Sequence, residues 1–277
     1  MTNNLDKSEF TIVTTFSQDG WDKYAHKFAK TMDKYLPENI EVLLYYEGAN
    51  HPNGFTGRMK FMNFDIHCGE KQKCFEEVEE PYRISVNPAG ANEPEFKFQA
   101  SRFAHKYHAC EHAINKITSR YLVWIDADVI TLKNVPRNFF YELVSEGSYW
   151  SRIGRGAEYP ECGFMIWDRQ HEVHKTFWDI MESMYGKGQL FKLSEWHDSY
   201  VWWEAEKILQ KNLENIAFDL GDGERGHAFV RGILGEYFDH LKGQRKIFGF
   251  SPEKKTFIHK LLYFLFFNTA KLLKIIK

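Results

Sequence analysis

Two carboxylates stand two residues apart at the end of an apolar run, in the segment from Tyr121 to Asp128. The apolar run is typical of a buried strand of an α/β sheet, and the carboxyl ends of such strands are where open α/β sheets bind ligands. If the strand continues unbroken, Asp126 and Asp128 point to the same side. Carboxylate oxygens suit Mg²⁺ or Mn²⁺, which also bind substrate phosphates. The segment therefore predicts metal-assisted chemistry on a phosphate-bearing molecule, and turn formation by both aspartates is the alternative.

Two carboxylates rarely complete a metal site, and the best candidate for a third ligand is His240. Imidazole is a natural ligand for Mn²⁺ and less so for Mg²⁺. Three residues later, Gly243 permits a close approach of the backbone to a ligand, and Lys246 can place a positive charge on a phosphate. The alternatives are an ordinary packed histidine and a solvated lysine.

The elements that would position these residues alternate between strands and helices. Residue patterns predict a strand over 10–16, a helix from Asp19 to about Leu36 and a strand over 40–46, which form a strand–helix–strand unit with parallel strands. Glycines and prolines in 51–95 predict loops and a short helix. The remaining predicted elements are helices over 101–116, 136–144, 170–185 and 195–210, and strands over 162–167 and 216–220.

The composition limits the class of protein. A chain of 277 residues with 43% apolar residues can form one large α/β domain. The formal net charge of −2 gives no field that attracts nucleic acid, so RNA or DNA is not expected as a partner. Four cysteines without a CxxC pair, after a polar N-terminal segment that does not resemble a signal peptide, favour free thiols in a reducing cytoplasm.

The stretch 251–277 combines apolar residues with regularly placed lysines, but it has no run of 18 apolar residues that would span a bilayer. Basic residues on an apolar helix favour an amphipathic anchor at the inner face of the membrane. A helix docked on the protein's own core is the alternative. The sequence therefore predicts a cytoplasmic protein with a domain over 1–250 and a basic, apolar C-terminal helix over 251–277. If this helix is an anchor, the protein contacts the membrane peripherally.

The Asp-x-Asp segment and the later His-x-x-Gly-x-x-Lys segment, after a strand–helix–strand start, resemble the GT-A glycosyltransferases. The resemblance is greatest to the family-8 group, which includes glycogenin and bacterial lipopolysaccharide galactosyltransferases. It implies a single GT-A type α/β domain, with a Rossmann-like mixed sheet flanked by helices. It also implies that Asp126, Asp128 and His240 hold the metal ion, while Gly243 and Lys246 contact the diphosphate.

The resemblance extends to further positions of this sequence. The residues implied to lie near the donor nucleotide-sugar are Thr14, Thr15, Phe16, Arg102 and Lys106. A solvated helix face is the alternative for the two basic residues. Asp198 falls where the family has an Asp-Gln-Asp motif facing the transferred sugar, which implies a catalytic role; helix capping is its alternative. The stretch 152–159 predicts a loop that contacts the acceptor or is plain surface. Glu161 stands where the family has an Asn-Ala type pair, which leaves donor sugar, acceptor and stereochemistry open.

The implied function is metal-dependent transfer of a hexose from a nucleotide-sugar, first a UDP-sugar, to a hydroxyl group of a glycan or glycolipid, with retention of configuration. A Mn²⁺ or Mg²⁺ ion and the catalytic Lys246 would offset the negative charge that grows on the leaving diphosphate. An inverting reaction would need a carboxylate base, for which Asp198 and Glu161 are the candidates.

Two other classes of protein remain open. The Asp126-Ala-Asp128 segment and a Gly-Asp-Gly turn at 221–223 resemble haloacid-dehalogenase-like phosphatases. In that class, however, the motif lies on an early strand, and here Ile130 stands where a threonine or valine is usual. The aromatic content of 17% is also compatible with a non-catalytic sugar-binding module.

Overall fold

The protein is represented by a computed structural model, which describes residues 8–48, 52–85, 95–211, 213, 215–221, 228–243, 245–249 and 251. Its centre is a seven-stranded sheet in the order β3-β2-β1-β4-β7-β6-β8. The strands of this sheet are β1 Phe10–Ser17, β2 Glu41–Glu47, β3 Met59–Asn63, β4 Tyr121–Ile125, β6 Trp150–Arg155, β7 Glu158–Asp168 and β8 Ala217–Asp219. A second sheet pairs β5 Val129–Thr131 with β9 Phe238–His240.

Strands β1 to β4 are mutually parallel, and β7 runs antiparallel to β4. The parallel pairing of β1 with β2, predicted from the strand–helix–strand start, is therefore confirmed. A parallel pair needs a crossover connection, which the helical segment 18–35 supplies. The predicted α/β class, a mixed sheet flanked by helices, is also confirmed.

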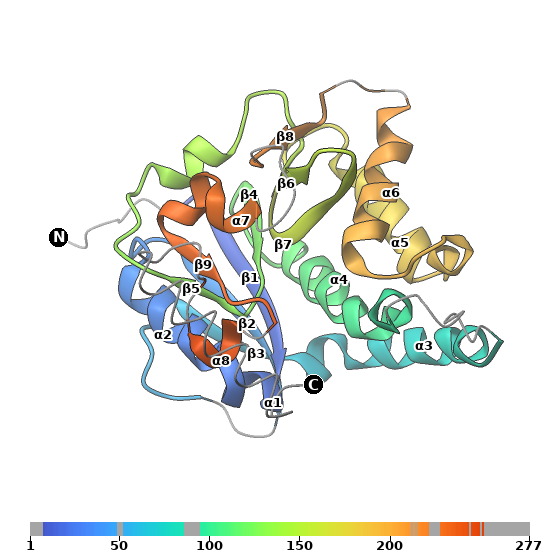
Figure 1. The fold of residues 1–277 in the computed structure, drawn as a ribbon, viewed down its shortest axis with the longest axis horizontal. Helices are drawn as coiled ribbons and strands as arrows, with labels where there is room; N and C mark the ends of the chain where they lie inside the picture. The colour runs from blue at the N-terminus through green and yellow to red at the C-terminus, as the bar shows by residue number, and fades with distance from the viewer. Residues whose placement is uncertain are drawn as a thin grey trace, which may run out of the picture.

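Helices cover both faces of the sheet (Figure 1). The α-helices are α1 Gln18–Gly20, α2 His26–Tyr35, α3 Phe64–Ser85, α4 Ala100–Ile114, α5 His174–Tyr185, α6 Asp198–Gln210, α7 Ala228–Arg231 and α8 Arg245–Phe248. A π-helical turn over Trp21–Ala25 joins α1 to α2. The 3-10 helices are Glu95–Phe98, Phe139–Leu143, Gln189–Lys192 and Ile233–Glu236.

The alternation of side chains along each strand divides the core into two layers. Val13 and Trp124 pack with α3, α4, α5 and α6, whereas Ile12 and Val123 pack with α2 and α7. Successive residues of a strand point to opposite faces, so a continuous apolar strand supplies both layers. Full burial of each large apolar side chain contributes about 1.5 to 3 kcal/mol. Strand β4 is buried at all five positions, which fixes the element that leads to the aspartate pair.

The prediction of loops and a short helix for 51–95 is correct only in part. A helix is present, but it is the 22-residue α3, and the stretch also contains strand β3. The apolar face of α3 is narrow: Phe64, Cys68 and Phe75 are buried, while charged residues occupy many of the other positions. Such a face gives a weak periodic signal. Pro81 lies inside the helix, where proline normally marks an end.

The loop predicted over 152–159 is also wrong, because β6 and β7 form a hairpin there. Gly156 has a φ of 67° at the turn, a conformation that favours glycine. Strand β7 extends well beyond the predicted range 162–167. The helix predicted over 136–144 is a short 3-10 helix, and the two helices that follow begin later than predicted, at His174 and Asp198.

The predicted C-terminal helix, 251–277, lies outside the described residues apart from Ser251. Within the described part of the chain, no helix is long and apolar enough to cross a bilayer. The division into a domain over 1–250 and a terminal helix therefore stays a prediction.

Candidate metal centre

The aspartate pair lies at the carboxyl end of β4, in a turn rather than in a continuing strand. β4 ends one residue before Asp126, and the Val129 amide donates to the Asp126 carbonyl at 3.0 Å. Two further backbone hydrogen bonds hold this turn: Asp126 donates to the Gly163 carbonyl, and Leu241 donates to the Asp128 carbonyl, both at 2.9 Å. The turn, and not the alternation of a strand, therefore brings the two carboxylates together.

The small sheet of β5 and β9 brings His240 to the aspartates, because Val129 pairs with His240 across it. Nε2 of His240 lies 3.1 Å from Oδ1 of Asp128 and 3.7 Å from Oδ2 of Asp126. One ligand atom of each residue lies within 4.8 Å of the other two. We call Asp126, Asp128 and His240 the Asp–Asp–His triad. Two carboxylates and an imidazole suit a divalent ion such as Mn²⁺, so the triad can hold the ion that the sequence predicts.

Gly163 on β7 leaves the space that the triad occupies. A Cβ at this position would lie 2.7 Å from Cε1 and 3.0 Å from Nδ1 of His240, and 3.4 Å from Oδ2 of Asp126. The first of these distances is shorter than real contacts of this kind allow. Because His240 is almost fully buried, its ring has little freedom to move away. The packing of the triad therefore requires glycine at position 163.

The His-x-x-Gly-x-x-Lys segment folds back over the triad. Gly243 has a φ of 62°, which the turn after β9 requires and which favours glycine. The turn places Nζ of Lys246 3.0 Å from Oδ2 of Asp128 and 4.1 Å from the ring centre of Tyr24. Burial raises the pKa of the Tyr24 phenol, and Asp128 and Asp126 raise it further. Tyr24, from the π-helical turn, is a site residue that the sequence reasoning missed.

Lys106 is buried, so its interpretation as a residue of a solvated helix face is wrong. Its Nζ lies 3.1 Å from Oδ1 of Asp126 and 2.5 Å from Oδ2 of Asp198, and it donates to the Cys162 carbonyl at 2.9 Å. Burial alone would lower the pKa of Lys106, but Asp126 and Asp198 raise it well above its usual value. Lys106 therefore links the triad to Asp198. Arg102, one turn earlier, is exposed.

Asp198 is the first residue of α6 and is almost fully buried. One carboxylate oxygen accepts from the Ser199 amide at 2.8 Å, and the other pairs with Lys106. Burial alone would raise the pKa of Asp198, but Lys106 and His197 lower it. The carboxylate thus stays ionised beside the triad and also bonds to the first turn of its helix. Both interpretations of Asp198, capping and a place at the site, agree with this geometry.

A cavity of about 160 Å³ opens beside the aspartates. The donor-side residues that line it are Thr15, Arg102 and Lys106, and it also contains Tyr24 and Trp124. The indole of Trp124 donates to Oδ1 of Asp126 at 2.7 Å. Thr14 and Phe16 are buried and are not among the residues that line the cavity, so only Thr15 of the predicted Thr-Thr-Phe segment reaches it.

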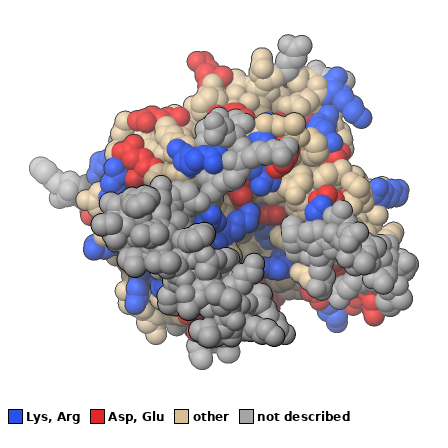
Figure 2. All heavy atoms as spheres, viewed as in Figure 1, with Lys and Arg blue, Asp and Glu red and all other residues tan. Residues whose placement is uncertain are grey.

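Trp124 could have been found from the sequence. It stands two residues before Asp126, which places both on one face of an extended chain. Tyr24 gives no such signal, because its position depends on the π-helical turn. In the face shown in Figure 2, Lys and Arg side chains lie near the middle of the molecule. Local positive charge of this kind favours an anionic ligand such as a diphosphate.

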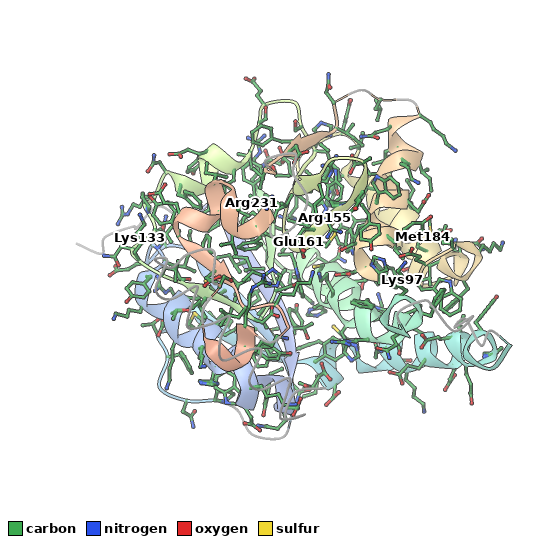
Figure 3. The ribbon with its side chains drawn as sticks, in the orientation of Figure 1. Lys97, Lys133, Arg155, Glu161, Met184 and Arg231 are labelled. Carbon is green, nitrogen blue, oxygen red and sulfur yellow. The ribbon has the colours of Figure 1, made fainter. Side chains whose placement is uncertain are left out.

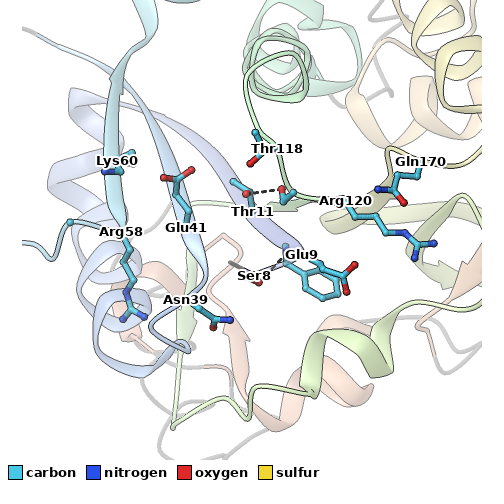
Figure 4. A pocket seen from close by; sticks show the side chains of 13 residues that line it. Ser8, Glu9, Thr11, Asn39, Glu41, Arg58, Lys60, Thr118, Arg120 and Gln170 are labelled. Atoms are coloured by element: carbon cyan, nitrogen blue, oxygen red, sulfur yellow. Dashed lines mark hydrogen bonds between the residues drawn. The ribbon is translucent and has the colours of Figure 1, made fainter. Parts of the chain in front are cut away.

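A larger cavity, of about 470 Å³, lies at the other end of the parallel strands (Figure 4). It is lined by residues at the start of these strands, such as Thr11, Glu41 and Lys60. Open α/β sheets bind ligands at the carboxyl ends of their strands. Two of its basic side chains are also engaged: Arg58 donates to the carbonyls of Leu36 and Pro37, at the end of α2, and Arg120 pairs with Asp168. The triad, and not this cavity, is therefore the candidate functional site.

Metal binding by the triad should depend on pH through His240. Burial alone would lower the pKa of His240, but Asp128, Glu161 and Asp126 raise it. A metal ion needs the neutral imidazole, so protons compete with it until the pH exceeds this raised pKa. We expect the affinity for Mn²⁺ to rise about tenfold per pH unit on the acidic side and then to level off above the usual histidine value of about 6.5. Titration of the protein with Mn²⁺ across this range would measure it, and a flat profile would contradict ligation by His240.

Comparison with known proteins finds similar solved structures but no matching family model or curated protein. Similar solved structures include mouse xyloside xylosyltransferase 1 in its apo form, with a TM-score of 0.46, 9% identity, and coverage of 76% of this chain and 85% of that chain. The apo-form glycosyltransferase GlyE of Streptococcus pneumoniae TIGR4 has a TM-score of 0.40, 9% identity, and coverage of 77% and 46%.

A third similar structure is a glycosyltransferase involved in the glycosylation of the major capsid of PBCV-1. Its TM-score is 0.38 with 13% identity, and the match covers 86% of this chain and 98% of that chain. The chain thus spans less than half of GlyE but most of the other two proteins. At this level of identity the likeness assigns no family to the chain.

Proposed function

We propose that the protein is a metal-dependent glycosyltransferase that moves a hexose from a nucleotide-sugar to a hydroxyl group of a glycan or glycolipid. A UDP-sugar is the first candidate for the donor. The observation that carries the proposal is the convergence of the Asp–Asp–His triad with Lys246 beside a cavity at the carboxyl end of β4. Acidic and imidazole ligands next to a lysine are suited to a divalent ion and a diphosphate together. Mn²⁺ is the preferred ion because one ligand is an imidazole, with Mg²⁺ as the alternative.

The proposed chemistry is the departure of a nucleoside diphosphate from the sugar. A bound divalent ion would supply Lewis-acid stabilisation of the charge that grows on the diphosphate. Lys246 would add a fixed positive charge on the same group, and Gly243 would let the backbone approach it. Lys106 would hold Asp126 and Asp198 in place, and Asp198, ionised and buried, would face the transferred sugar. Retention of configuration is implied by the family resemblance alone.

Aromatic rings beside Asp198 support a sugar acceptor. A row of neighbouring rings begins at Phe103, which lines the cavity. The ring centres lie 6.2, 4.7, 6.2 and 5.9 Å apart in the order Phe103, His197, Tyr159, Tyr200 and Trp203. Apolar and aromatic side chains with a few polar groups are the usual lining of ligand sites. We therefore propose that the acceptor approaches along the side of α6. Contact of the C-terminal stretch with a membrane, and a cytoplasmic location, stay predictions.

The rival functions differ in their products, so a single incubation separates them. We expect the protein with Mn²⁺ and no acceptor to release UDP slowly from its UDP-sugar donor. A haloacid-dehalogenase-like phosphatase would instead release inorganic phosphate from a phosphate ester, and a sugar-binding module would release neither product. The stability of the folded protein, measured with Mn²⁺ and each member of a panel of nucleotide-sugars, should show which donor binds. A ligand at a hundred times its Kd stabilises the folded protein by about 2.7 kcal/mol. Absence of both UDP release and Mn²⁺-dependent stabilisation across the panel would reject the proposal.

A further inference from the structure

An ion pair beside the triad has no place in the function proposed above. Glu161 on β7 is 7% exposed, and its two carboxylate oxygens lie 3.2 and 2.9 Å from Nζ of Lys242. The Lys242 side chain is 56% exposed. The pair therefore joins a buried carboxylate to an ammonium group that reaches solvent. Figure 3 shows Glu161 near the middle of the molecule, close to Arg155.

The backbone places both members of the pair next to the triad. Lys242 follows His240 by two residues, and its amide donates to the His240 carbonyl at 2.9 Å. Glu161 precedes Gly163 by two residues, and Gly163 packs against the triad. An irregularity in the pairing of β7 with β6 sets the direction of the Glu161 side chain. Adjacent residues of β6 pair with Met165 and Glu161, so β7 bulges between these two positions. Bulges of this kind are common next to active sites, where they redirect a side chain.

The two charges of the pair act on the triad in opposite directions. Burial alone would raise the pKa of Glu161, but Lys242 and His240 lower it to about 2, so the carboxylate is ionised at neutral pH. A fixed negative charge near a cation site strengthens cation binding, and a fixed positive charge weakens it. Salt screens such effects little when the charge is buried, which is the case for Glu161.

We infer that the Glu161–Lys242 pair sets the affinity of the Asp–Asp–His triad for a divalent ion, with Glu161 strengthening binding and Lys242 weakening it. The inference rests on the proposed function only in requiring that the triad binds a metal ion. Both residues act through the triad, so they are positioning residues of the metal centre. Lys242 is the exposed member of the pair, so its charge can be removed by substitution with little disturbance of the core.

The test is the affinity of the full chain for Mn²⁺ alone, without nucleotide, at neutral pH and fixed salt. We expect Glu161→Gln to weaken binding by about tenfold, because it leaves the Lys242 charge uncompensated near the ion. We expect Lys242→Met to tighten binding by about the same factor, since it leaves the Glu161 charge uncompensated. The double variant should return close to the wild-type affinity.

Opposite signs are the decisive result, because a merely structural role would weaken binding in both variants. Equal affinities for all four proteins, or weaker binding by both single variants, would overturn the inference. Lys242→Met alters a mostly exposed side chain, so it tests the sign even if Glu161→Gln does not fold. The exposed pair of Lys133 and Glu236 gives the matched control, and Lys133→Met should leave Mn²⁺ affinity unchanged. A wild type that binds Mn²⁺ but neither releases UDP from any donor nor is stabilised by any of them would reject the proposed function and leave this inference standing. A wild type that binds no Mn²⁺ rejects both.

Discussion

Replacing Asp128 by asparagine is expected to lower Mn²⁺-dependent release of UDP from the donor by at least about a hundredfold. The Asp128 carboxylate lies 3.1 Å from Nε2 of His240 and 3.0 Å from Nζ of Lys246. Burial alone would raise the pKa of Asp128, but His240 and Lys246 lower it, so the carboxylate is ionised at neutral pH. Stabilisation by a metal ion is worth several kcal/mol, and each ~1.4 kcal/mol is tenfold in rate.

The Asp128→Asn experiment has three measurements: UDP release, Mn²⁺ affinity and the unfolding midpoint. Asparagine keeps the shape of the side chain, so we expect a folded protein that binds Mn²⁺ weakly. Asp179→Asn is the matched control, because Asp179 pairs with Lys175 on the exposed side of α5. It should change neither turnover nor metal affinity. Wild-type turnover in Asp128→Asn would show that Asp128 is not a metal ligand.

Replacing Lys106 by methionine is expected to cost about 3 to 5 kcal/mol of unfolding free energy, as removal of one partner from a buried ion pair does. Methionine keeps most of the apolar stem but leaves Asp198 buried and without its cation. Urea unfolding measures the effect directly. Lys133→Met is the control, because its pair with Glu236 is exposed, and such pairs are worth about 0 to 1 kcal/mol. A loss as small as that of the control would show that Lys106 is not needed to hold Asp198.

The cost of Lys106→Met should depend on pH in a defined direction. The folded-state pKa of Asp198 is lowered, so its contribution is present above the unfolded value of about 3.9 and is lost as the pH falls through the folded pKa. The folded-state pKa of Lys106 is raised, so its contribution is present below about 10.4 and is lost as the pH rises through the folded pKa. The difference between wild type and variant should therefore be nearly constant between these two limits.

Strands and helices with strong apolar patterns could be predicted from the sequence. β4 is apolar at every position, and the helix before it was predicted within two residues at each end. β3 and the full length of α3 escaped prediction, because their apolar patterns are weak and a proline lies inside the helix. The hairpin of β6 and β7 escaped because a glycine-containing stretch is as compatible with a tight turn between strands as with a loop.

The candidate site shows the same division. Asp126, Asp128 and His240 were predicted as a set, and the structure brings them together. Their ligation of an ion stays a prediction. Lys106 was harder, since a lysine is buried only where partners compensate its charge, and Asp198 lies 92 residues further along the chain. No local pattern contains that information. The positions of Tyr24 and Lys242 likewise depend on a π-helical turn and on the turn after β9.

The pairing of β5 with β9 has a consequence for folding during translation. All seven strands of the large sheet precede β9 in the chain, so the ribosome delivers them before it delivers His240. Domains begin to fold as they emerge, N-terminal parts first. A newly made chain can thus assemble its large sheet around two aspartates while His240, the third member of the triad, is still being synthesised. The triad is therefore complete only late in translation, when β9 pairs with β5.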